Sequence, residues 1–433
     1  MSAQIDDKIK FASRKELEQL QASRLRELLV EIYGKNKFYT EKFDQAGFDP
    51  GAFNAIDDLS QLPFTTKIEL LNDQVNTGFA ANLTYPLSAY VRFHQTSGTT
   101  GEPLHVFDTL DSWNWWGRCW REVFLGAGLC AEDRLFCAVS FGPFIGFWAA
   151  VEGARQLGML MIPGGGRSSL DRLRLMLDTQ CTALCCTPSY ALHLLEVAKE
   201  NDFDIGELKI RILVLAGEPG ANIPATKKRI NDGWAAQCHD HAGASEVGAF
   251  GFEPRNRPNG LYVNESEFIA EVLDKTSQQP VADGEEGELV LTNLGRWGFP
   301  VIRYRTGDVV KYSSPGESSG EFLYLQGGII GRADDMVTVR GVNIFPSAID
   351  NLVREMDVID EYRATVQIRG EMSELTIEIE VAANQNVDIA KATLLKSISN
   401  KLGLRPIIES VAHKVLPRFE LKGKRFHVNV EMD

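Results

Sequence analysis

Hydroxyl residues and glycines are concentrated in the segment Thr96-Ser97-Gly98-Thr99-Thr100-Gly101, which follows a run typical of a β-strand. Backbone amides and hydroxyl groups can donate hydrogen bonds to phosphate oxygens, and glycine lets the backbone approach them closely. The segment therefore predicts a phosphate-binding loop. It lacks the spacing and the lysine of the Walker A sequence G-x-x-x-x-G-K-[ST], which disfavours an ordinary P-loop ATPase or kinase. Taken alone, the same residues also fit a plain Ser/Thr/Gly turn.

The elements that must position this loop are those of an α/β protein. From about residue 90 to 310, β-rich runs such as ALCCTP and RILVLAGE alternate with helical patterns such as SYALHLLEVAKEN. This alternation predicts a layered α/β domain with mostly parallel strands. We expect this domain to span 1–331, with a helical cap over about 1–90 and a β-rich subdomain over about 285–331. Residues 332–433 predict a small α+β domain.

Composition and charge limit the partners that the chain can have. Its 433 residues are enough for two or three folding units. The net charge of −14 disfavours nucleic acid, because a polyanion would be repelled. The one long charge-free apolar run, 135–151, is interrupted by glycine and proline and is too short to span a membrane. The N-terminus lacks the apolar core and cleavage site of a secretory signal, so we expect a cytoplasmic protein.

Cysteine and histidine give no metal-binding pattern. The seven cysteines form no C-x-x-C pair, which disfavours both a disulfide framework and a zinc ribbon. Cys181, Cys185 and Cys186 lie in an apolar stretch, and we interpret them as buried structural thiols. His239 and His241 have no third and fourth ligand at suitable spacing, so we favour packing or pocket polarity over metal binding.

Five further segments complete an ordered set of motifs, and together with the loop at 96–101 they resemble the adenylate-forming superfamily. The resemblance is strongest to its phenylacetate-CoA ligase-like branch and runs from about Asp58 to Arg425. The five segments are Gly217-Glu218-Pro219, Gly243-Ala244-Ser245-Glu246-Val247-Gly248, Tyr304-Arg305-Thr306-Gly307-Asp308, Gly331-Arg332-Ala333-Asp334-Asp335-Met336 and Arg340-Gly341-Val342-Asn343-Ile344-Phe345-Pro346.

The resemblance implies a role for each motif. Asp308 is expected to accept hydrogen bonds from the ribose hydroxyls, and Arg332 to reach the ribose or a phosphate. Glu246 is expected to help hold Mg²⁺, a cation that prefers carboxylate oxygen. Asp334 matches the hinge between the domains. The implied ATP- and AMP-binding residues are Thr96, Ser97, Gly98, Thr100, Gly101, Gly217, Glu218, Pro219, Gly243, Ala244, Ser245, Asp308 and Arg332, with Thr99, Glu246 and a C-terminal lysine as catalytic residues.

The catalytic lysine lies in the segment 416–425, which resembles the last motif of the superfamily. Lysine there would neutralise charge that develops between the carboxylate and the α-phosphate. We assign this role to Lys422 and keep Lys424 as its rival, because the usual preceding glycine is replaced by Leu421 and a glycine follows at 423.

Two other residues differ from those that are usual in the superfamily, and both lie in motifs of the expected nucleotide site. Glu102 stands where many relatives carry a lysine in the phosphate loop, which reverses a charge near the expected triphosphate. Ala242 replaces an aromatic residue before Gly243, so adenine stacking must come from elsewhere.

The segment 140–148, SFGPFIGFW, indicates which class of acid the enzyme would activate. Relatives build an acyl pocket here, and we assign Phe141, Gly142 and Ala216 to it. Aromatic side chains and glycines can hold a flat ring, which favours an aromatic or arylacetic acid. Core packing would explain the aromatic residues equally well.

The reaction that the resemblance implies has two steps and needs ATP, Mg²⁺ and coenzyme A. The carboxylate attacks the α-phosphate to give an acyl-adenylate and pyrophosphate, and the thiol then displaces AMP. An adenylating enzyme that uses a carrier-protein thiol or an amine, and a non-catalytic nucleotide-binding protein, are the alternatives. Family members of this branch often form homodimers, so a homodimer is also expected.

Overall fold

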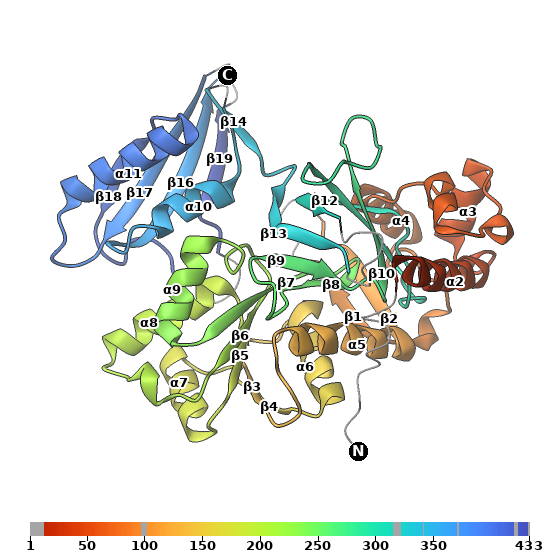
Figure 1. Cartoon of the computed structure of the whole chain (residues 1–433), viewed down its shortest axis with the longest axis horizontal. Helices are drawn as coiled ribbons and strands as arrows, with labels where there is room; N and C mark the ends of the chain where they lie inside the picture. The colour runs from red at the N-terminus through yellow and green to blue at the C-terminus, as the bar shows by residue number, and fades with distance from the viewer. Residues whose placement is uncertain are drawn as a thin grey trace.

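The computed structural model describes residues 13–96, 102–314, 322–340, 342–369, 372–419 and 423–431 (Figure 1). Most of the strands belong to one eleven-stranded sheet with the order β10-β11-β12-β13-β9-β8-β7-β6-β5-β3-β4. One half of this sheet is parallel and the other antiparallel. The antiparallel strands therefore extend the same sheet.

The parallel half is buried on both faces by helices. Ala183 and Cys185 of β5 belong to the apolar core on the side of α5 and α6. Leu184 and Cys186 of the same strand belong to the core beneath α7, α8 and α9. A strand covered on both faces consists of apolar residues throughout, because side chains alternate between the faces. The elements are β3 (Arg134–Cys137), α6 (Ile145–Leu157), β4 (Leu160–Pro163), α7 (Ser169–Asp178), β5 (Ala183–Cys186), α8 (Pro188–Glu200), β6 (Ile212–Leu215), α9 (Pro224–Trp234) and β7 (Gln237–Ala244).

The antiparallel half consists of strands joined mainly by short connections. Its central pair, β12 and β13, is in a register that places Asp308 opposite Arg332. The strands are β8 (Gly248–Phe252), β9 (Gly260–Val263), β10 (Phe268–Leu273), β11 (Glu286–Asn293), β12 (Tyr304–Ser313) and β13 (Tyr324–Arg332).

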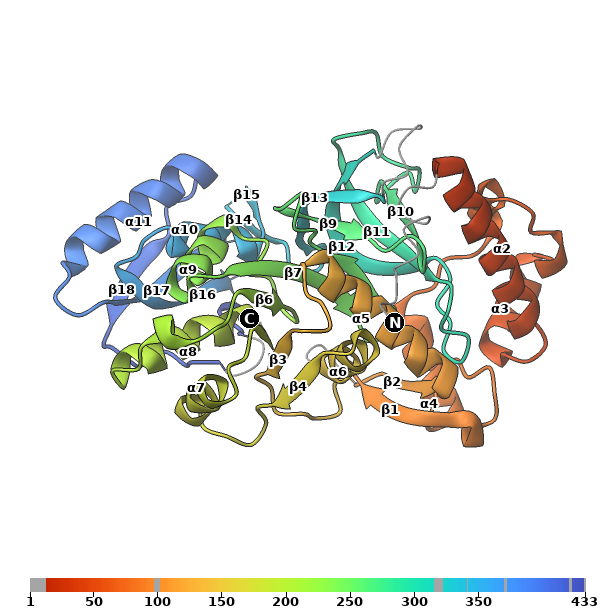
Figure 2. The ribbon, with the colours of Figure 1, turned by 60° about the horizontal axis from the view of Figure 1, so that its bottom comes forward.

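The N-terminal elements cover the antiparallel end of the sheet, where α2 and α3 lie at the opposite end of the molecule from the C-terminal unit (Figures 1 and 2). An extended segment at Thr65 pairs with β12: its N–H donates to Arg303 at 3.0 Å, and its carbonyl accepts from Arg305 at 2.9 Å. The N-terminal elements are α2 (Arg14–Ile32), α3 (Lys37–Ala46), α4 (Lys67–Thr77) and the hairpin β1 (Tyr90–Gln95) and β2 (His105–Thr109), with short 3-10 helices at Pro50–Ala52, Ile56–Gln61 and Leu87–Ala89. They are followed by α5 (Leu110–Gly126), which packs against α6 and β8. A further 3-10 helix, Ile205–Glu207, lies between α8 and β6.

The residues after β13 form a separate four-stranded sheet with the order β18-β17-β16-β19. Its helix α10 packs against α9, where Thr226 Oγ1 donates to Asp350 Oδ2 at 3.1 Å. Figures 1 and 2 show this unit beside α8 and α9. The elements are β14 (Val337–Val339), β15 (Val342–Ile344), α10 (Pro346–Arg354), β16 (Ile359–Arg369), β17 (Met372–Val381), α11 (Val387–Leu402), β18 (Ile407–Val411) and β19 (Phe426–Glu431).

The fold class expected from the sequence is confirmed: a layered α/β unit with parallel strands, a β-rich stretch and a small α+β unit at the C-terminus. Within the described part of the chain, no helix is long and apolar enough to cross a membrane.

Candidate active site

The predicted motifs come together at one edge of the large sheet. Residues 138–144 follow β3, residues 216–219 follow β6, and residues 243–246 end β7 and begin the turn after it. These segments leave the carboxyl ends of strands, which is where ligands bind in open α/β sheets. The sheet order β3-β5-β6-β7 therefore collects motifs that are far apart in the sequence.

The predicted phosphate loop begins at this edge. Thr96 is buried, and its Oγ1 accepts the N–H of Leu104 at 3.0 Å. The N–H of Gln95 donates to the carbonyl of Pro143 at 2.8 Å, which joins the start of the loop to the predicted acyl segment. Glu102 is exposed. The other predicted loop residues, Ser97, Gly98, Thr99, Thr100 and Gly101, lie outside the described residues.

Glu246 lies in the turn between β7 and β8 with its side chain only 8% exposed. Its Oε1 is 3.0 Å from Nζ of Lys67, the first residue of α4. The carboxylate of Glu246 is also one of the causes that raise the pKa of Tyr304, after burial of the phenol itself. Sequence reasoning missed Lys67. The capping pair Thr66 and Glu69 marks a helix start there, but no local pattern links this helix to Glu246.

A buried arginine holds the turn that carries Glu246. Arg296 donates from Nη1 to the carbonyls of Ser245 at 2.7 Å and Glu246 at 3.1 Å. It also forms a two-pronged pair with Asp108, with donor–acceptor distances of 2.7 and 2.8 Å, and both side chains are 0% exposed. The fork of an arginine suits this task, because separate N–H groups can hold a carboxylate and the backbone at once. Neither residue was predicted.

Asp308 and Arg332 face each other from β12 and β13. Arg332 Nη1 is 3.9 Å from Asp308 Oδ1 and the arginine side chain is half exposed, so it is available to a ligand. Gly307 precedes Asp308 with a φ of +75°, a left-handed conformation that favours glycine. Burial raises the pKa of Asp308 to about 6, helped by the negative charge of Glu246 and opposed by Arg332.

The ribose-binding role expected for Asp308, taken together with its pKa, predicts how nucleoside binding depends on pH. Above about pH 6 the carboxylate is ionised and can accept hydrogen bonds from both ribose hydroxyls, and this capacity is lost as the pH falls through 6. We expect the affinity for adenosine to fall by about tenfold or more below this pH, the scale of hydrogen bonds to a charged acceptor. Adenosine is the probe because it carries no phosphate that titrates near pH 6. Calorimetry should show weak, pH-independent binding in Asp308→Asn, and a wild-type affinity that is constant between pH 5 and 8 would contradict this assignment.

The segment 216–219 contacts both the sheet and the C-terminal unit. Ala216 is buried, and its N–H donates to the carbonyl of Cys186 at 3.1 Å. Gly217 and Pro219 are exposed. The carboxylate of Glu218 does not extend toward open solvent: Oε1 accepts the N–H of Ser189 at 2.7 Å, and Oε2 accepts the N–H of Gly423.

The predicted acyl pocket contains a pair of aromatic rings after β3. Phe141 is half-buried, and its ring centroid is 4.6 Å from that of Trp148. Trp148 Nε1 donates to the carbonyl of Gly142 at 2.9 Å, which fixes the orientation of the indole. Phe141 and Ala216 both border the same apolar core.

Of the segment 416–425, which contains the predicted catalytic lysine, the structure describes residues 416–419 and 423–425, and Lys422 lies outside the described residues. Lys424 is exposed. A Cβ at Gly423 would be 2.4 Å from Arg425 Nη1 and 2.8 Å from Ser189 Oγ. The glycine at 423 is therefore explained by close packing between the C-terminal unit and α8.

Asp334, the predicted hinge residue, lies between the end of β13 at Arg332 and the start of β14 at Val337. This connection is the link between the eleven-stranded sheet and the C-terminal unit.

Histidines and cysteines take structural positions. His241 packs on Trp120 with ring centroids 4.2 Å apart, and its Nδ1 is 2.7 Å from the carbonyl of Gly251. Cys181, Cys185 and Cys186 are buried, as expected. In the described ranges, no three His, Cys, Asp or Glu residues are grouped so that they could hold a metal ion.

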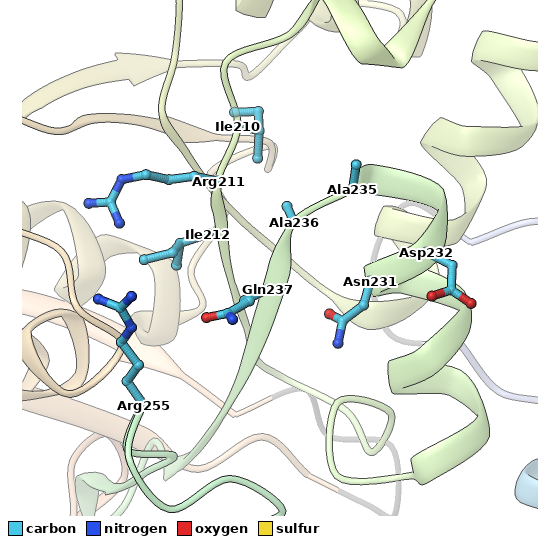
Figure 3. A pocket seen from close by; sticks show the side chains of 9 residues that line it. All are labelled: Ile210, Arg211, Ile212, Asn231, Asp232, Ala235, Ala236, Gln237 and Arg255. Carbon is cyan, nitrogen blue, oxygen red and sulfur yellow. The ribbon is translucent and has the colours of Figure 1, made fainter.

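A hollow at the other edge of the sheet is separate from these motifs. Figure 3 shows its lining, which includes Arg211, Gln237 and Arg255. Ile212 and Gln237 begin β6 and β7, so the hollow lies at the amino ends of the strands whose carboxyl ends carry the motifs.

Comparison with known proteins shows the family of the chain. The family described as AMP-binding enzyme matches residues 89–295, and the AMP-binding enzyme C-terminal domain matches residues 341–428. A phenylacetate-coenzyme A ligase of Escherichia coli (strain K12) is 33% identical over 379 residues, which cover 87% of this chain and 85% of that protein. A phenylacetate-coenzyme A ligase of Pseudomonas putida is 30% identical over 431 residues, covering 98% and 96%.

Solved structures of 2-hydroxyisobutyryl-CoA ligase are similar over nearly the whole chain. The postadenylation state with 2-HIB-AMP matches with a TM-score of 0.91 at 26% identity, covering 97% of this chain and 91% of that one. The thioesterification state with 2-HIB-AMP and CoA matches with a TM-score of 0.73 at 27% identity, covering 98% and 92%. The chain thus belongs to the phenylacetate-coenzyme A ligase family of AMP-binding enzymes and is an AMP-forming acid–CoA ligase that uses ATP, Mg²⁺ and coenzyme A.

Proposed function

We propose that the enzyme activates a small aromatic or arylacetic acid and transfers the acyl group to coenzyme A. The observation that carries this proposal is the ring pair of Phe141, in the segment after β3, and Trp148 of α6, with ring centroids 4.6 Å apart. A half-buried aromatic surface there can stack a flat acid. The names of the sequence relatives support it, while the similarity to 2-hydroxyisobutyryl-CoA ligase favours a short hydroxy acid as the second candidate.

In the first step, a carboxylate oxygen of the acid would bond to the α-phosphorus of ATP as the bond to pyrophosphate breaks. Asp308 and Arg332 would bind the ribose and a phosphate, and Lys422 would stabilise the charge that develops at the α-phosphate. In the second step, the thiolate sulfur of coenzyme A would bond to the acyl carbon and AMP would leave. The side chains supply position and charge, and neither step needs a nucleophile of the enzyme.

Glu246 fits the expected Mg²⁺ site. Its carboxylate is nearly buried and pairs with the ammonium of Lys67 at 3.0 Å, a contact that Mg²⁺ would displace or share. Mg²⁺ is commonly held by one or two carboxylates together with substrate phosphates. Bound there, it would neutralise charge on the phosphates. Arg296 would keep the turn with Glu246 in place.

The two units would change their relative arrangement between the two steps of the reaction. We propose domains over 1–331 and 332–433, with rotation about Asp334 between the arrangement for adenylation and the one for thioester formation. The higher TM-score to the postadenylation state than to the thioesterification state supports the first arrangement for this structure. The homodimer, which we also propose, is tested by light scattering of the purified protein.

The test of the proposed function is ATP- and Mg²⁺-dependent pyrophosphate release across aromatic, arylacetic and short hydroxy acids, with and without coenzyme A. AMP and an aryl-CoA thioester are the expected products. Turnover confined to short hydroxy acids would replace the aromatic assignment by the second candidate. Pyrophosphate without a thioester would indicate another acceptor.

Phe141→Ala tests the acyl pocket. We expect kcat/KM for the preferred aromatic acid to fall by about 10- to 100-fold, because differential contacts in an apolar pocket have this scale. The affinity for AMP should stay unchanged, since Phe141 belongs to the acyl segment. Phe79→Ala, which removes an exposed aromatic residue of another cluster, is the control and should leave both values unchanged. A loss that is equal for aromatic and short acids would argue against an aromatic pocket.

A further inference from the structure

We propose that Glu218 is a positioning residue that holds the lysine-bearing segment of the C-terminal unit in place for acyl-adenylate formation. This proposal rests on the proposed function and changes the role of Glu218 from nucleotide binding to the coupling of the two units. Its basis is a single carboxylate that accepts one N–H from each unit: that of Ser189 in α8, at 2.7 Å, and that of Gly423.

The first bond anchors Glu218 to the large unit. Ser189 is the second residue of α8, so its N–H has no acceptor within the helix. A negative charge at this position is also favoured by the helix dipole. This bond to the carboxylate involves residues of the large unit only.

The second bond reaches the backbone next to Lys422. Gly423 directly follows this lysine, and its N–H points at the carboxylate of Glu218. A hydrogen bond to a charged acceptor is stronger than one to a neutral group. Glu218 therefore holds the backbone at Gly423, the residue that follows Lys422 in the sequence.

The packing around Gly423 supports the same role independently. Arg425 Nη1 donates to Ser189 Oγ at 2.7 Å, and the same arginine pairs with Glu361 through two bonds of 2.7 and 2.8 Å. A Cβ at Gly423 would be 2.4 Å from Arg425 Nη1. A side chain at 423 would therefore have to displace the guanidinium of Arg425 or the hydroxyl of Ser189, the groups that join the two units here.

The contact is specific to one arrangement of the units. When the C-terminal unit rotates for the second step, the bond from Gly423 to Glu218 must break. Loss of this bond should therefore slow the first step and leave the second step unhindered.

The experiment measures each half-reaction separately in Glu218→Gln and Gly423→Ala. The amide of Glu218→Gln has no charge and only one acceptor oxygen, and Gly423→Ala displaces the lysine segment without touching residues 216–219. Both variants should form the acyl-adenylate about 10- to 100-fold more slowly, the scale of an ångström-sized misplacement, with KM for ATP unchanged. Thioester formation from supplied acyl-adenylate should stay within about twofold of wild type. Because both changes break the same contact, the double variant should be no slower than the slower single variant.

Lys414→Ala is the matched control. The pair between Lys414 and Glu200 joins the same two units at 2.8 Å, but both side chains are exposed, at 56% and 43%. An exposed pair contributes little, so both half-reactions should be unchanged. A higher KM for ATP in Glu218→Gln with a normal rate at saturation, or a normal rate in Gly423→Ala, would overturn the proposal.

A distance measurement tests the contact without any substrate. Spin labels at Arg174→Cys in α7 and Ala392→Cys in α11 lie on exposed positions of the two units, with the exposed thiol removed by Cys130→Ser. In Glu218→Gln the distance distribution should shift away from the docked population of the wild type. Identical distributions would refute the role of Glu218 even if the enzyme activates an acid as proposed, and failure to find any acid would leave this result valid.

Discussion

Replacing Lys422 by alanine is expected to slow acyl-adenylate formation by about 10²- to 10³-fold, the loss typical of removing one group that stabilises transition-state charge. Negative charge accumulates at the α-phosphate as the carboxylate attacks, and the ammonium group would neutralise it. Thioester formation from supplied acyl-adenylate should be nearly unchanged, because the lysine serves only the first step. Pyrophosphate exchange and thioester formation, measured separately, check this prediction.

Lys424→Ala is the matched control for the lysine assignment. Lys424 is exposed and lies on the other side of Gly423, whose packing against Arg425 fixes the backbone between the two lysines. Its replacement should leave adenylation unchanged. Equal losses in both half-reactions of Lys422→Ala, or a defect confined to Lys424→Ala, would transfer the role to Lys424. The two variants Lys422→Ala and Glu218→Gln can also be told apart. In Lys422→Ala, acyl-adenylate formation should be slow even when the two units are docked.

Replacing Asp108 by asparagine is expected to destabilise the protein by about 3–5 kcal/mol, because it leaves the fully buried guanidinium of Arg296 without its counter-charge. The change removes one charge and almost no volume, so packing contributes little. Adenylation should weaken as well, since Arg296 also holds the carbonyls of Ser245 and Glu246. Urea unfolding gives the stability, and pyrophosphate release gives the rate.

The control for Asp108→Asn is Asp232→Asn, which breaks the pair with Lys228 on the surface of α9, where both side chains are mostly exposed. Solvent screens such a pair, so stability should not change measurably. If Asp108→Asn unfolds at the same urea concentration as the wild type, the buried pair does not stabilise the turn with Glu246. Normal stability with lost activity would place the effect of Asp108 in the site alone.

Several features of the fold follow from local sequence. The runs ALCC and ILVL are apolar throughout and became the buried strands β5 and β6, because a parallel strand between two helical layers has no polar face. The run LTIEIEVA, in which apolar and polar residues alternate, forms β17 of the small sheet, because successive side chains of a strand point to opposite faces of the sheet. The Thr-Gly-Asp run at 306–308 was expected as a turn, but it lies inside β12, where the pairing with β11 is irregular and Gly307 takes a positive φ.

Only the tertiary structure decided which charged side chains meet. Lys67 pairs with Glu246, Asp108 with Arg296, and Glu218 with the backbone of Gly423, and each pair joins elements that are far apart in the sequence. The amino-acid sequence determined residue types and local backbone, which carry no information on such partners. A hydrogen bond between distant residues depends on the strand order, the register and the packing angle of whole elements. These are fixed by the summed burial of the core, so the partners of Glu246 and Glu218 became visible only in the folded chain.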